Sequence, residues 1–249
     1  LSIDPECLLR CALTHDWDHV TDCCECLVTT AGAEEAVKEQ LLRTDQYGNS
    51  VLQAACYHRP PVLAVTGILR VAQHDGIARL VVHNRALDQS TCFHVACATG
   101  ASFPVIREIL EASDNPRELI INADQQNATP MSDLVVQYTL ERKSPENMRT
   151  SRPLEDIHDV YAEKERSVFF TSFWNKLELM LFAASGSKSI LHGAASVAPM
   201  CPPLLTDFLL RNFDAKQMDN RLLPLHVAIS ESSTYSERHD YFIEQLLNS

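Results

Sequence analysis

The sequence of 249 residues contains only 7 glycines and no run of about 20 consecutive apolar residues, the length that a membrane-spanning helix requires. We therefore expect no membrane span. Glycine-rich phosphate-binding loops, the Gly-x-Ser-x-Gly nucleophile elbow and the His-Glu-x-x-His zinc motif are also missing. The sequence also shows no arrangement of paired carboxylates that would indicate acid–base catalysis. These absences favour a protein that is not an enzyme, and we assign no catalytic residue and no cofactor.

Basic residues are scarce as well. The chain has 21 Lys and Arg against 33 Asp and Glu, so its formal net charge at pH 7 is −12. Nucleic-acid phosphates attract clustered Lys and Arg, and no such cluster stands out, so we expect no nucleic-acid partner. An acidic surface instead favours a basic protein or peptide. Hydrophobic residues make up 45% of the chain, as in folded domains.

The nine cysteines are an odd number, and Cys56, Cys92 and Cys97 fall where a helix carries small residues. This placement predicts reduced thiols that pack as small hydrophobic groups. Disulfides are rare in the cytosol and nucleus, so we expect a cytoplasmic or nuclear protein. A thiol enzyme is the least favoured interpretation, because no partner base can be identified. The chain begins at Leu1 without a methionine, which leaves open a regulatory module of a larger signalling protein or enzyme.

A metal site near the N-terminus is a further alternative. Cys and His recur there every four residues, and a Cys-x-x-Cys spacing follows; the residues are Cys7, Cys11, His15, His19, Cys23, Cys24 and Cys26. On one helix the separation of 12 positions between Cys7 and His19 corresponds to about 18 Å, which is too far for the side chains to share one ion. Buried thiols with surface histidines are therefore favoured, and no metal ligand is assigned.

The segment Asp88–Leu110 predicts two helices joined by a tight turn. Thr91 is a suitable N-cap because its hydroxyl can accept hydrogen bonds from free backbone N–H groups. Gly100 can adopt the left-handed conformation that ends a helix, and Pro104 fits the first turn of the next one. The apolar stripe of such a pair cannot be buried by the pair alone, so it needs neighbours of the same kind.

Those neighbours are present, because the pattern recurs in Ser50–Leu69, Thr129–Val135, Ser189–Leu210 and Leu223–Leu247. The five N-cap positions are separated by 41, 38, 60 and 34 residues in turn. A period of about 33 residues with insertions is typical of stacked helix pairs. We therefore expect an all-α fold.

The repeated motifs resemble those of the ankyrin-repeat family, whose pattern is Thr-Pro-Leu-His-x-Ala-Ala. The matching segments are SVLQAAC, TCFHVAC, TPMSDLV, SILHGAA and LPLHVAI. The family's Asp-x-x-Gly turn stands as Asp45–Gly48 and recurs as Asp124–Asn127, with an Asn that also tolerates positive φ. The resemblance implies an ankyrin-like solenoid of about five to six helix-turn-helix repeats with irregular insertions. Armadillo-like and tetratricopeptide-like arrays are less favoured alternatives.

One continuous solenoid is expected, in four parts. Residues 1–44 form a degenerate N-terminal helical repeat, 45–140 regular ankyrin-like repeats, 141–166 a charged insertion, and 167–249 the C-terminal ankyrin-like repeats. We interpret the insertion as a solvated loop followed by a charged helix. A less favoured interpretation is that its Ser144-Pro145 dipeptide is a phosphorylation site for a proline-directed kinase.

Polar residues occupy one equivalent position in the five motifs. They are Gln53, His94, Ser132, His192 and His226. Because each lies in a separate repeat, we expect a column of side chains that hydrogen-bond the backbone and the neighbouring repeats. A catalytic role for the three histidines is far less favoured.

The segment Ser167–Ser185 predicts the most apolar helix of the chain. We expect it to be the second helix of the repeat that begins at Thr129, packed in the core. The alternative is that Phe170 and Trp174 stay partly exposed as a partner-binding patch, since aromatic residues are enriched at interface hot spots.

The favoured function is a scaffold or adaptor that binds a protein or peptide on the concave face of the repeats. The resemblance implies that partners contact the loops between repeats, called fingers, and the exposed ends of the first helices. By position in the repeat, the expected contact residues are Gln46, Tyr47, Asn49, Tyr57, His58, Asp88, Ser90, Gln125, Gln126 and Asn220. Tyr47 and Tyr57 are the strongest candidates, because tyrosine combines contact area with a polar tip.

Overall fold

In the computed structural model the chain is helical, and the prediction of an all-α fold is confirmed for the described residues. These are 7–29, 34–142, 168–185, 190–196, 203–212, 224, 228 and 237–248. They form fourteen α-helices, and within them the extended backbone is limited to an isolated bridge between Thr44 and Ser50. None of these helices combines the length and apolar character that crossing a bilayer requires.

The chain divides into two compact units, residues 1–130 and 131–249. The boundary lies inside the segment 45–140 that the sequence predicts to be one run of regular repeats. The helices of the first unit are α1 (Cys7–Thr14), α2 (Trp17–Thr29), α3 (Glu34–Leu42), α4 (Val51–Tyr57), α5 (Val62–His74), α6 (Ala78–Val82), α7 (Cys92–Thr99), α8 (Phe103–Glu111) and α9 (Pro116–Ile121).

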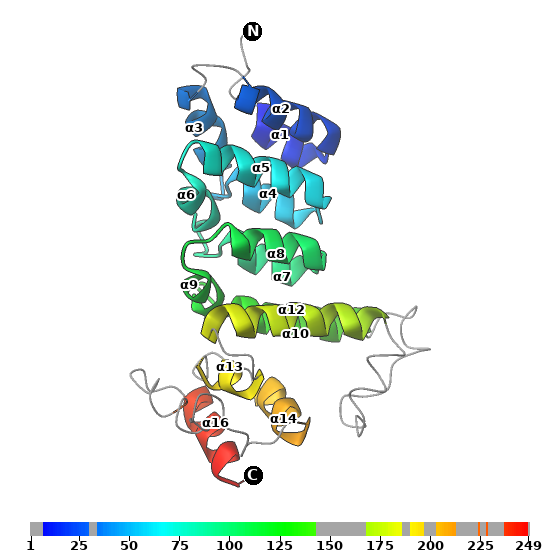
Figure 1. Cartoon of the computed structure of the whole chain (residues 1–249), viewed down its shortest axis with the longest axis vertical. Coiled ribbons are helices and arrows are strands. Elements are labelled where there is room, and N and C mark those ends of the chain that lie inside the picture. The colour runs from blue at the N-terminus through cyan, green and yellow to red at the C-terminus, as the bar shows by residue number, and fades with distance from the viewer. Residues whose placement is uncertain are drawn as a thin grey trace. The chain divides into compact units, whose positions relative to one another are not determined.

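Three helix pairs stack in the first unit (Figure 1). The pairs are α1 with α2, α4 with α5, and α7 with α8. The first helices form one row, in which α4 contacts both α1 and α7, and the second helices form a parallel row, in which α5 contacts both α2 and α8. Each pair thus buries its apolar stripe against the next pair, as the repeats predict.

Local sequence explains where these helices begin and end. Ser50 caps α4 in a capping box: the Gln53 N–H donates to its hydroxyl, and the Gln53 side chain accepts the Ser50 N–H. Thr91 is the N-cap of α7, and Gly100 ends that helix with a φ of 75°. Pro104 lies in the first turn of α8. The predicted signals are therefore confirmed here.

Small side chains line the first helices and larger ones the second. Ala55, Cys56, Ala96 and Cys97 have no exposed surface, so α4 and α7 pack closely. The second helices contribute fully buried side chains such as Val65, Ile68, Ile106 and Ile109. Burying one such side chain stabilises the fold by about 1.5–3 kcal/mol before the entropy cost. The expected packing of Cys56, Cys92 and Cys97 as small buried groups is confirmed.

Two short helices, α6 and α9, were not predicted. Each follows the second helix of a pair and precedes the next finger. They supply the extra residues that lengthen the first two repeats to 41 and 38 residues. Asn115 caps α9 by accepting the Glu118 N–H, and Pro116 occupies its first turn, so a start signal was present for this helix.

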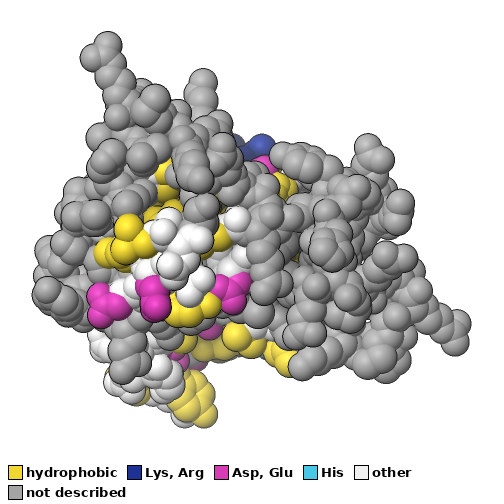
Figure 2. All heavy atoms as spheres, turned by 90° about the horizontal axis from the view of Figure 1, so that it is seen from below, with side chains coloured by type: hydrophobic (Ala, Val, Ile, Leu, Met, Phe, Trp, Pro, Cys, Tyr) yellow, Lys and Arg dark blue, Asp and Glu magenta, His cyan; other side chains and the backbone are white. Residues whose placement is uncertain are grey.

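The second unit contains α10 (Pro130–Arg142), α12 (Val168–Ser185), α13 (Ile190–Ser196), α14 (Pro203–Asn212) and α16 (Glu237–Asn248). The Tyr138 ring of α10 stacks on Phe173 of α12, with 4.3 Å between centroids. Gly193 lets α13 approach α12, because a Cβ at that position would lie 3.0 Å from Leu181 Cβ. Seen from below, acidic side chains lie beside hydrophobic ones on the described surface (Figure 2).

The aromatic helix α12 packs in the core, as the favoured interpretation predicts. Trp174 is only 4% exposed, and its indole N–H donates to Glu178 Oε1 at 2.5 Å. Its expected alternative, a partly exposed Trp174 in a binding patch, is therefore wrong. The Phe170 side chain, Ser144-Pro145, His226 and most of the predicted insertion 141–166 lie outside the described residues.

Candidate partner-binding site

The first unit contains three finger loops: residues 45–50 and 86–91 connect its stacked pairs, and residues 124–129 follow α9. Each is closed by the same backbone hydrogen bond, in which the first residue donates to the carbonyl four residues later. The donor and acceptor pairs are Asp45 with Asn49 at 3.0 Å, Ala86 with Ser90 at 3.0 Å, and Asp124 with Ala128 at 2.9 Å. The common geometry means that positions in the three loops correspond one to one.

The fourth residue of every finger loop has a left-handed backbone. Gly48 has a φ of 81°, Gln89 of 66° and Asn127 of 60°. Glycine adopts this conformation without strain, and Asn tolerates it better than most residues. The expectation that Asn replaces Gly in the third loop is thus confirmed.

Neighbouring finger loops are hydrogen-bonded to one another. The Leu87 N–H donates to the Tyr47 carbonyl, and the Gln125 N–H donates to the Asp88 carbonyl, both at 2.9 Å. The Gln125 side chain adds a bond from Nε2 to the Leu87 carbonyl at 2.7 Å. The three loops therefore form a continuous strip, which holds their side chains at fixed spacing.

This strip places the expected contacts Asp88 and Ser90 of the second loop at the positions of Tyr47 and Asn49 in the first. Ala86 occupies the place of Asp45, because the closing bond uses only backbone atoms that any residue provides. Asp88 then corresponds to Tyr47 and to Gln126. An acidic side chain consequently stands next to a tyrosine on adjacent loops.

The predicted polar column is confirmed at its two described members in this unit. Gln53 Nε2 donates to the Ser90 carbonyl at 2.9 Å, and His94 Nε2 lies 3.0 Å from the Asn122 carbonyl. His94 Nδ1 accepts the Thr91 N–H at 3.1 Å, so Nε2 carries the proton of the neutral ring. Burial lowers the pKa of His94. Each side chain therefore joins one helix pair to the loop that precedes the next helix pair.

A pocket of about 440 Å³ lies where the first two finger loops meet the end of α4. Two aromatic side chains border it and remain accessible, Tyr47 at 61% exposed and Tyr57 at 44%. Its lining is Asp45, Tyr47, Asn49, Tyr57, Ala86, Leu87 and Asp88. Four of the residues expected to contact a partner are thus brought together: Tyr47, Asn49, Tyr57 and Asp88.

The two carboxylates of the pocket are held in place by the loops. Asp45 Oδ1 accepts the N–H groups of Tyr47 and Asn49 at 2.8 and 2.9 Å. Asp88 Oδ1 accepts the Ser90 N–H at 2.9 Å. Burial, followed by the charges of Asp88 and Asp45, raises the pKa of Tyr57, so the field of both carboxylates reaches the phenol. The pocket is therefore acidic and its charges are fixed.

Two predicted contact residues are more buried than expected. The side chains of Asn49 and Ser90 are 6% exposed, because both lie at the base of their loops, next to the N-caps of α4 and α7. Asn49 still lines the pocket, where its Oδ1 has no hydrogen-bond partner. Gln46, Gln125 and Gln126 are exposed, as expected for finger tips. Asn220 lies outside the described residues.

His58 does not join the pocket. Its ring lies 3.8 Å from that of His15, which is also stacked on Trp17 at 6.2 Å. Of the N-terminal residues with metal-like spacing, His15 and His19 are exposed and Cys11 and Cys24 are buried, as the favoured interpretation predicts, whereas Cys23 and Cys26 are only partly buried. Asp45 and Leu87, by contrast, line the pocket but were not predicted to contact a partner.

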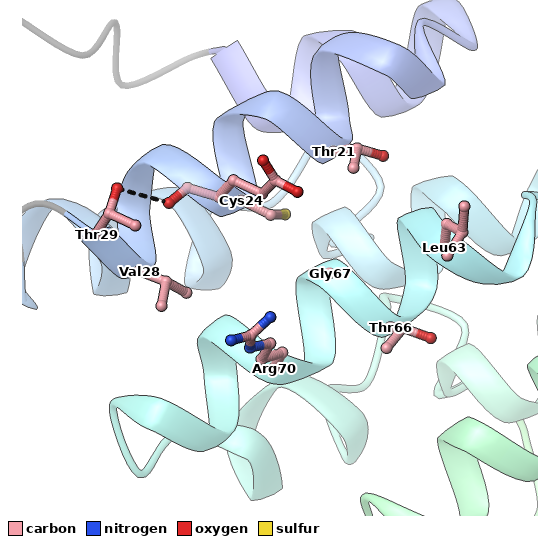
Figure 3. Close-up of a pocket in the computed structure, with 9 residues that line it drawn as sticks. Thr21, Cys24, Val28, Thr29, Leu63, Thr66, Gly67 and Arg70 are labelled. Atoms are coloured by element: carbon pink, nitrogen blue, oxygen red, sulfur yellow. Dashed lines mark hydrogen bonds between the residues drawn. The ribbon is translucent and has the colours of Figure 1, made fainter.

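A second pocket, of about 330 Å³, lies between α2 and α5 (Figure 3). The Arg70 and Leu63 side chains border it, and Cys24 lies on its α2 side, where the α5 backbone comes close at Gly67. Burial raises the pKa of Cys24 to about 12. This cysteine is therefore a protonated thiol at neutral pH and is poorly suited to act as a nucleophile.

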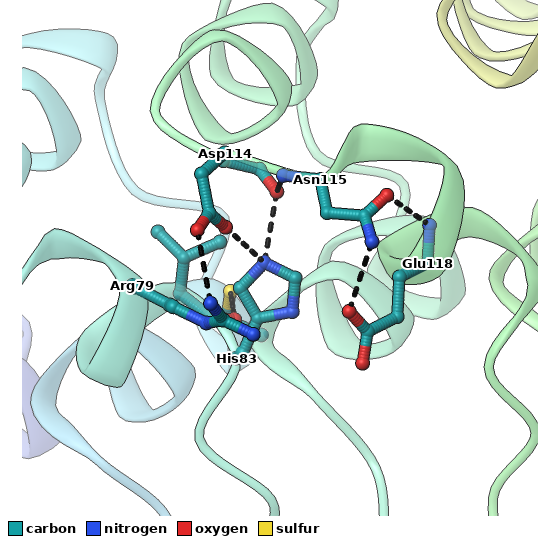
Figure 4. A network of polar contacts seen from close by, with 8 residues as sticks. Arg79, His83, Asp114, Asn115 and Glu118 are labelled. Atoms are coloured by element: carbon teal, nitrogen blue, oxygen red, sulfur yellow. Dashed lines mark hydrogen bonds and ion pairs between the residues drawn. The ribbon is translucent and has the colours of Figure 1, made fainter.

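A Ser–His–Asp cluster joins α6 to the turn before α9 (Figure 4). His83 Nε2 lies 2.8 Å from Ser113 Oγ and 3.6 Å from Asp114 Oδ1. In a catalytic triad the serine and the aspartate contact different ring nitrogens, whereas here both contact the same one. The Arg79 guanidinium pairs with Asp114 at 3.3 Å. The arrangement therefore ties two segments together and does not form a proton relay.

The sequence matches no model of a known protein family, and a search of curated proteins finds no match.

Proposed function

We propose that this chain is a non-catalytic scaffold or adaptor with an ankyrin-like repeat architecture, which binds a protein or peptide on the finger loops of residues 1–130. The observation that carries the proposal is the convergence of Tyr47, Asn49, Tyr57 and Asp88 on one pocket. Tyrosines that combine exposed area with a polar tip are favoured contacts at protein interfaces.

The strip formed by the finger loops 45–50, 86–91 and 124–129, here called the finger strip, supports this role because it is ordered before a partner binds. Its loops are fixed by backbone bonds within and between loops, so a partner would not have to order them on binding. Binding sites that are rigid before association lose less entropy on complex formation. The stacked pairs behind the strip supply that rigidity.

Site-specific photo-crosslinking tests the proposal. Leu87 on the second finger and Leu63 on α5 are 67% and 70% exposed, so a crosslinking residue at either position samples solvent equally. We expect a defined partner to be captured from position 87 and not from 63, and to be lost in the Tyr47→Ala/Tyr57→Ala variant that circular dichroism shows to be folded. Capture from position 63 alone would reject the finger strip as the binding surface.

A further inference from the structure

The pocket between the first two finger loops, here called the finger pocket, is lined by two carboxylates without a cationic partner, Asp45 and Asp88. The ion pairs among the described residues involve neither Asp45 nor Asp88, and the lining of the pocket contains no Lys, Arg or His. Backbone N–H groups hold one oxygen of each carboxylate: two N–H groups donate to Asp45 Oδ1 and one to Asp88 Oδ1. Their negative field therefore points at whatever occupies the pocket.

The Asn49 side chain adds one further acceptor to the lining. Asn49 Nδ2 donates to Asp45 Oδ2 at 3.0 Å, which identifies Oδ1 as the other end of the amide. That Oδ1 is buried and unpartnered, in a side chain that lines the pocket. A buried acceptor without a donor costs about 1–3 kcal/mol. The occupant that suits this pocket must therefore bring N–H donors together with positive charge.

The size and aromatic border of the pocket favour one class of side chain. A volume of about 440 Å³ lies within the range of small-ligand pockets, about 300–1,000 Å³, so a long side chain fits. Tyr47 and Tyr57 offer rings on which a cation can rest. A guanidinium is planar, presents five N–H donors and is more weakly hydrated than an ammonium. A bound metal ion is less suited, because only two carboxylates are present and one already accepts several hydrogen bonds.

We propose that the finger pocket binds an arginine side chain of the partner, with the guanidinium between Asp45, Asp88 and Asn49 and beside the two tyrosine rings. This inference rests on the proposed function and specifies the chemistry of the partner. The formal net charge of −12 is consistent with this partner, because a negatively charged surface attracts basic segments.

Titration of the ¹⁵N-labelled full chain with Nα-acetyl-arginine amide tests the proposal, and Nα-acetyl-citrulline amide is the matched probe without charge. We expect arginine to shift the Leu87 and Asp88 amide signals with saturation, and citrulline to bind at least about tenfold more weakly, since charge-assisted bonds are lost. Asp88→Asn keeps an acceptor for the Ser90 N–H, so the loop stays folded while arginine binding falls about fivefold or more.

Equal binding of citrulline, no saturable shift at these amides, or the same shifts with calcium chloride would each overturn the arginine assignment. Partner capture from position 87 is independent of these results. If capture persists while arginine fails, only the chemistry of the pocket is wrong; if capture fails too, the proposed function is rejected.

Discussion

His94 is a buried residue whose neutral form is required by its bonds. Nδ1 accepts the Thr91 N–H, and Nε2–H is directed at the Asn122 carbonyl, so an added proton would have to displace the cap of α7. Burial lowers the pKa of His94 in the folded state. The unfolded chain therefore binds the proton more readily, and the stabilisation present above the unfolded pKa, about 6.5, is lost as the pH falls below it.

We predict that His94→Gln flattens the loss of stability below pH 6.5. Glutamine is the residue at the equivalent position 53, where its amide also donates to a backbone carbonyl further along the chain and does not titrate. At pH 8 the variant should lie within about 1 kcal/mol of the natural chain, because one hydrogen-bonding side chain replaces another. Urea unfolding at several pH values measures this. The exposed His19→Gln serves as control, and an unchanged pH slope in His94→Gln would contradict the prediction.

Gln89 is the residue of the finger loops least suited to its backbone. Its φ of 66° is left-handed, where Gly48 and Asn127 occupy the equivalent positions. For an ordinary residue this conformation costs about 1–2 kcal/mol, and part of the gain from glycine is offset by chain entropy. We predict that Gln89→Gly raises the free energy of unfolding by about 0.5–1 kcal/mol. Gln46→Gly, on an exposed finger tip without this strain, should be neutral or destabilising in the same thermal unfolding assay.

At the scale of elements, the contact between α12 and α13 depends on Gly193. A Cβ there would lie 3.0 Å from Leu181 Cβ and 3.1 Å from the Leu181 carbonyl oxygen, and the backbone of α12 cannot yield easily. Gly193→Ala should therefore lower the free energy of unfolding by about 1–3 kcal/mol, even though alanine favours helix.

Gly67→Ala is the matched comparison for Gly193→Ala, because Gly67 lies where α5 packs against α2. The nearest atoms would be Cys24 Cβ at 3.3 Å and Sγ at 3.5 Å, both on a side chain. The gain in helix propensity, about 1 kcal/mol, then offsets the small adjustment. We expect urea unfolding to show a larger loss for Gly193→Ala than for Gly67→Ala, and the reverse order would refute the steric account.

The sequence was sufficient to place most helices, because their signals are local. Ser50, Thr91, Gly100 and Pro104 mark starts and stops through their own backbone conformation or through contacts with residues close by in the sequence. Helix α6 has no such marker: its N-cap is Ile77, which provides no side-chain cap. Its five residues are held by tertiary contacts with α3 and α5, which periodicity alone cannot reveal.

The pocket was predictable only in part, for a related reason. Tyr47 and Tyr57 follow from the repeat pattern, and the first loop was identified from its Asp and Gly. The second loop lacks the Asp-x-x-Gly signature, because Ala86 closes it through backbone atoms and Gln89 stands in the place of Gly48; its expected contacts Asp88 and Ser90 nevertheless fall at the positions of Tyr47 and Asn49. The approach of Asp88 to Tyr57, and the place of Leu87 in the lining, depend on the contact between neighbouring loops, which a sequence pattern does not show.

For the whole molecule, we predict that residues 1–130 fold alone. This unit is compact and has its own buried core, which includes Leu8, Leu52, Ile68 and Phe93. A chain that ends at Pro130 should keep a helical circular dichroism spectrum and a cooperative thermal transition. It should also bind Nα-acetyl-arginine amide within about threefold of the full chain, since the pocket lies in this unit. A non-cooperative melt would show that residues 131–249 are required for folding.

During synthesis, the hydrogen bonds of the polar column can form only in order from the N-terminus, because each one needs a carbonyl that is made later. Gln53 can close its own cap box as soon as α4 has emerged, yet the carbonyl of Ser90 that its amide requires lies 37 residues later. At 5–20 residues per second this delay is roughly two to seven seconds. His94 likewise waits for a carbonyl 28 residues further on. When a ribosome pauses after one helix pair, the amide of that pair's column residue therefore still lacks its carbonyl acceptor. Synthesis of the next segment supplies this acceptor, and the column residue of the following pair is then the one that lacks a partner.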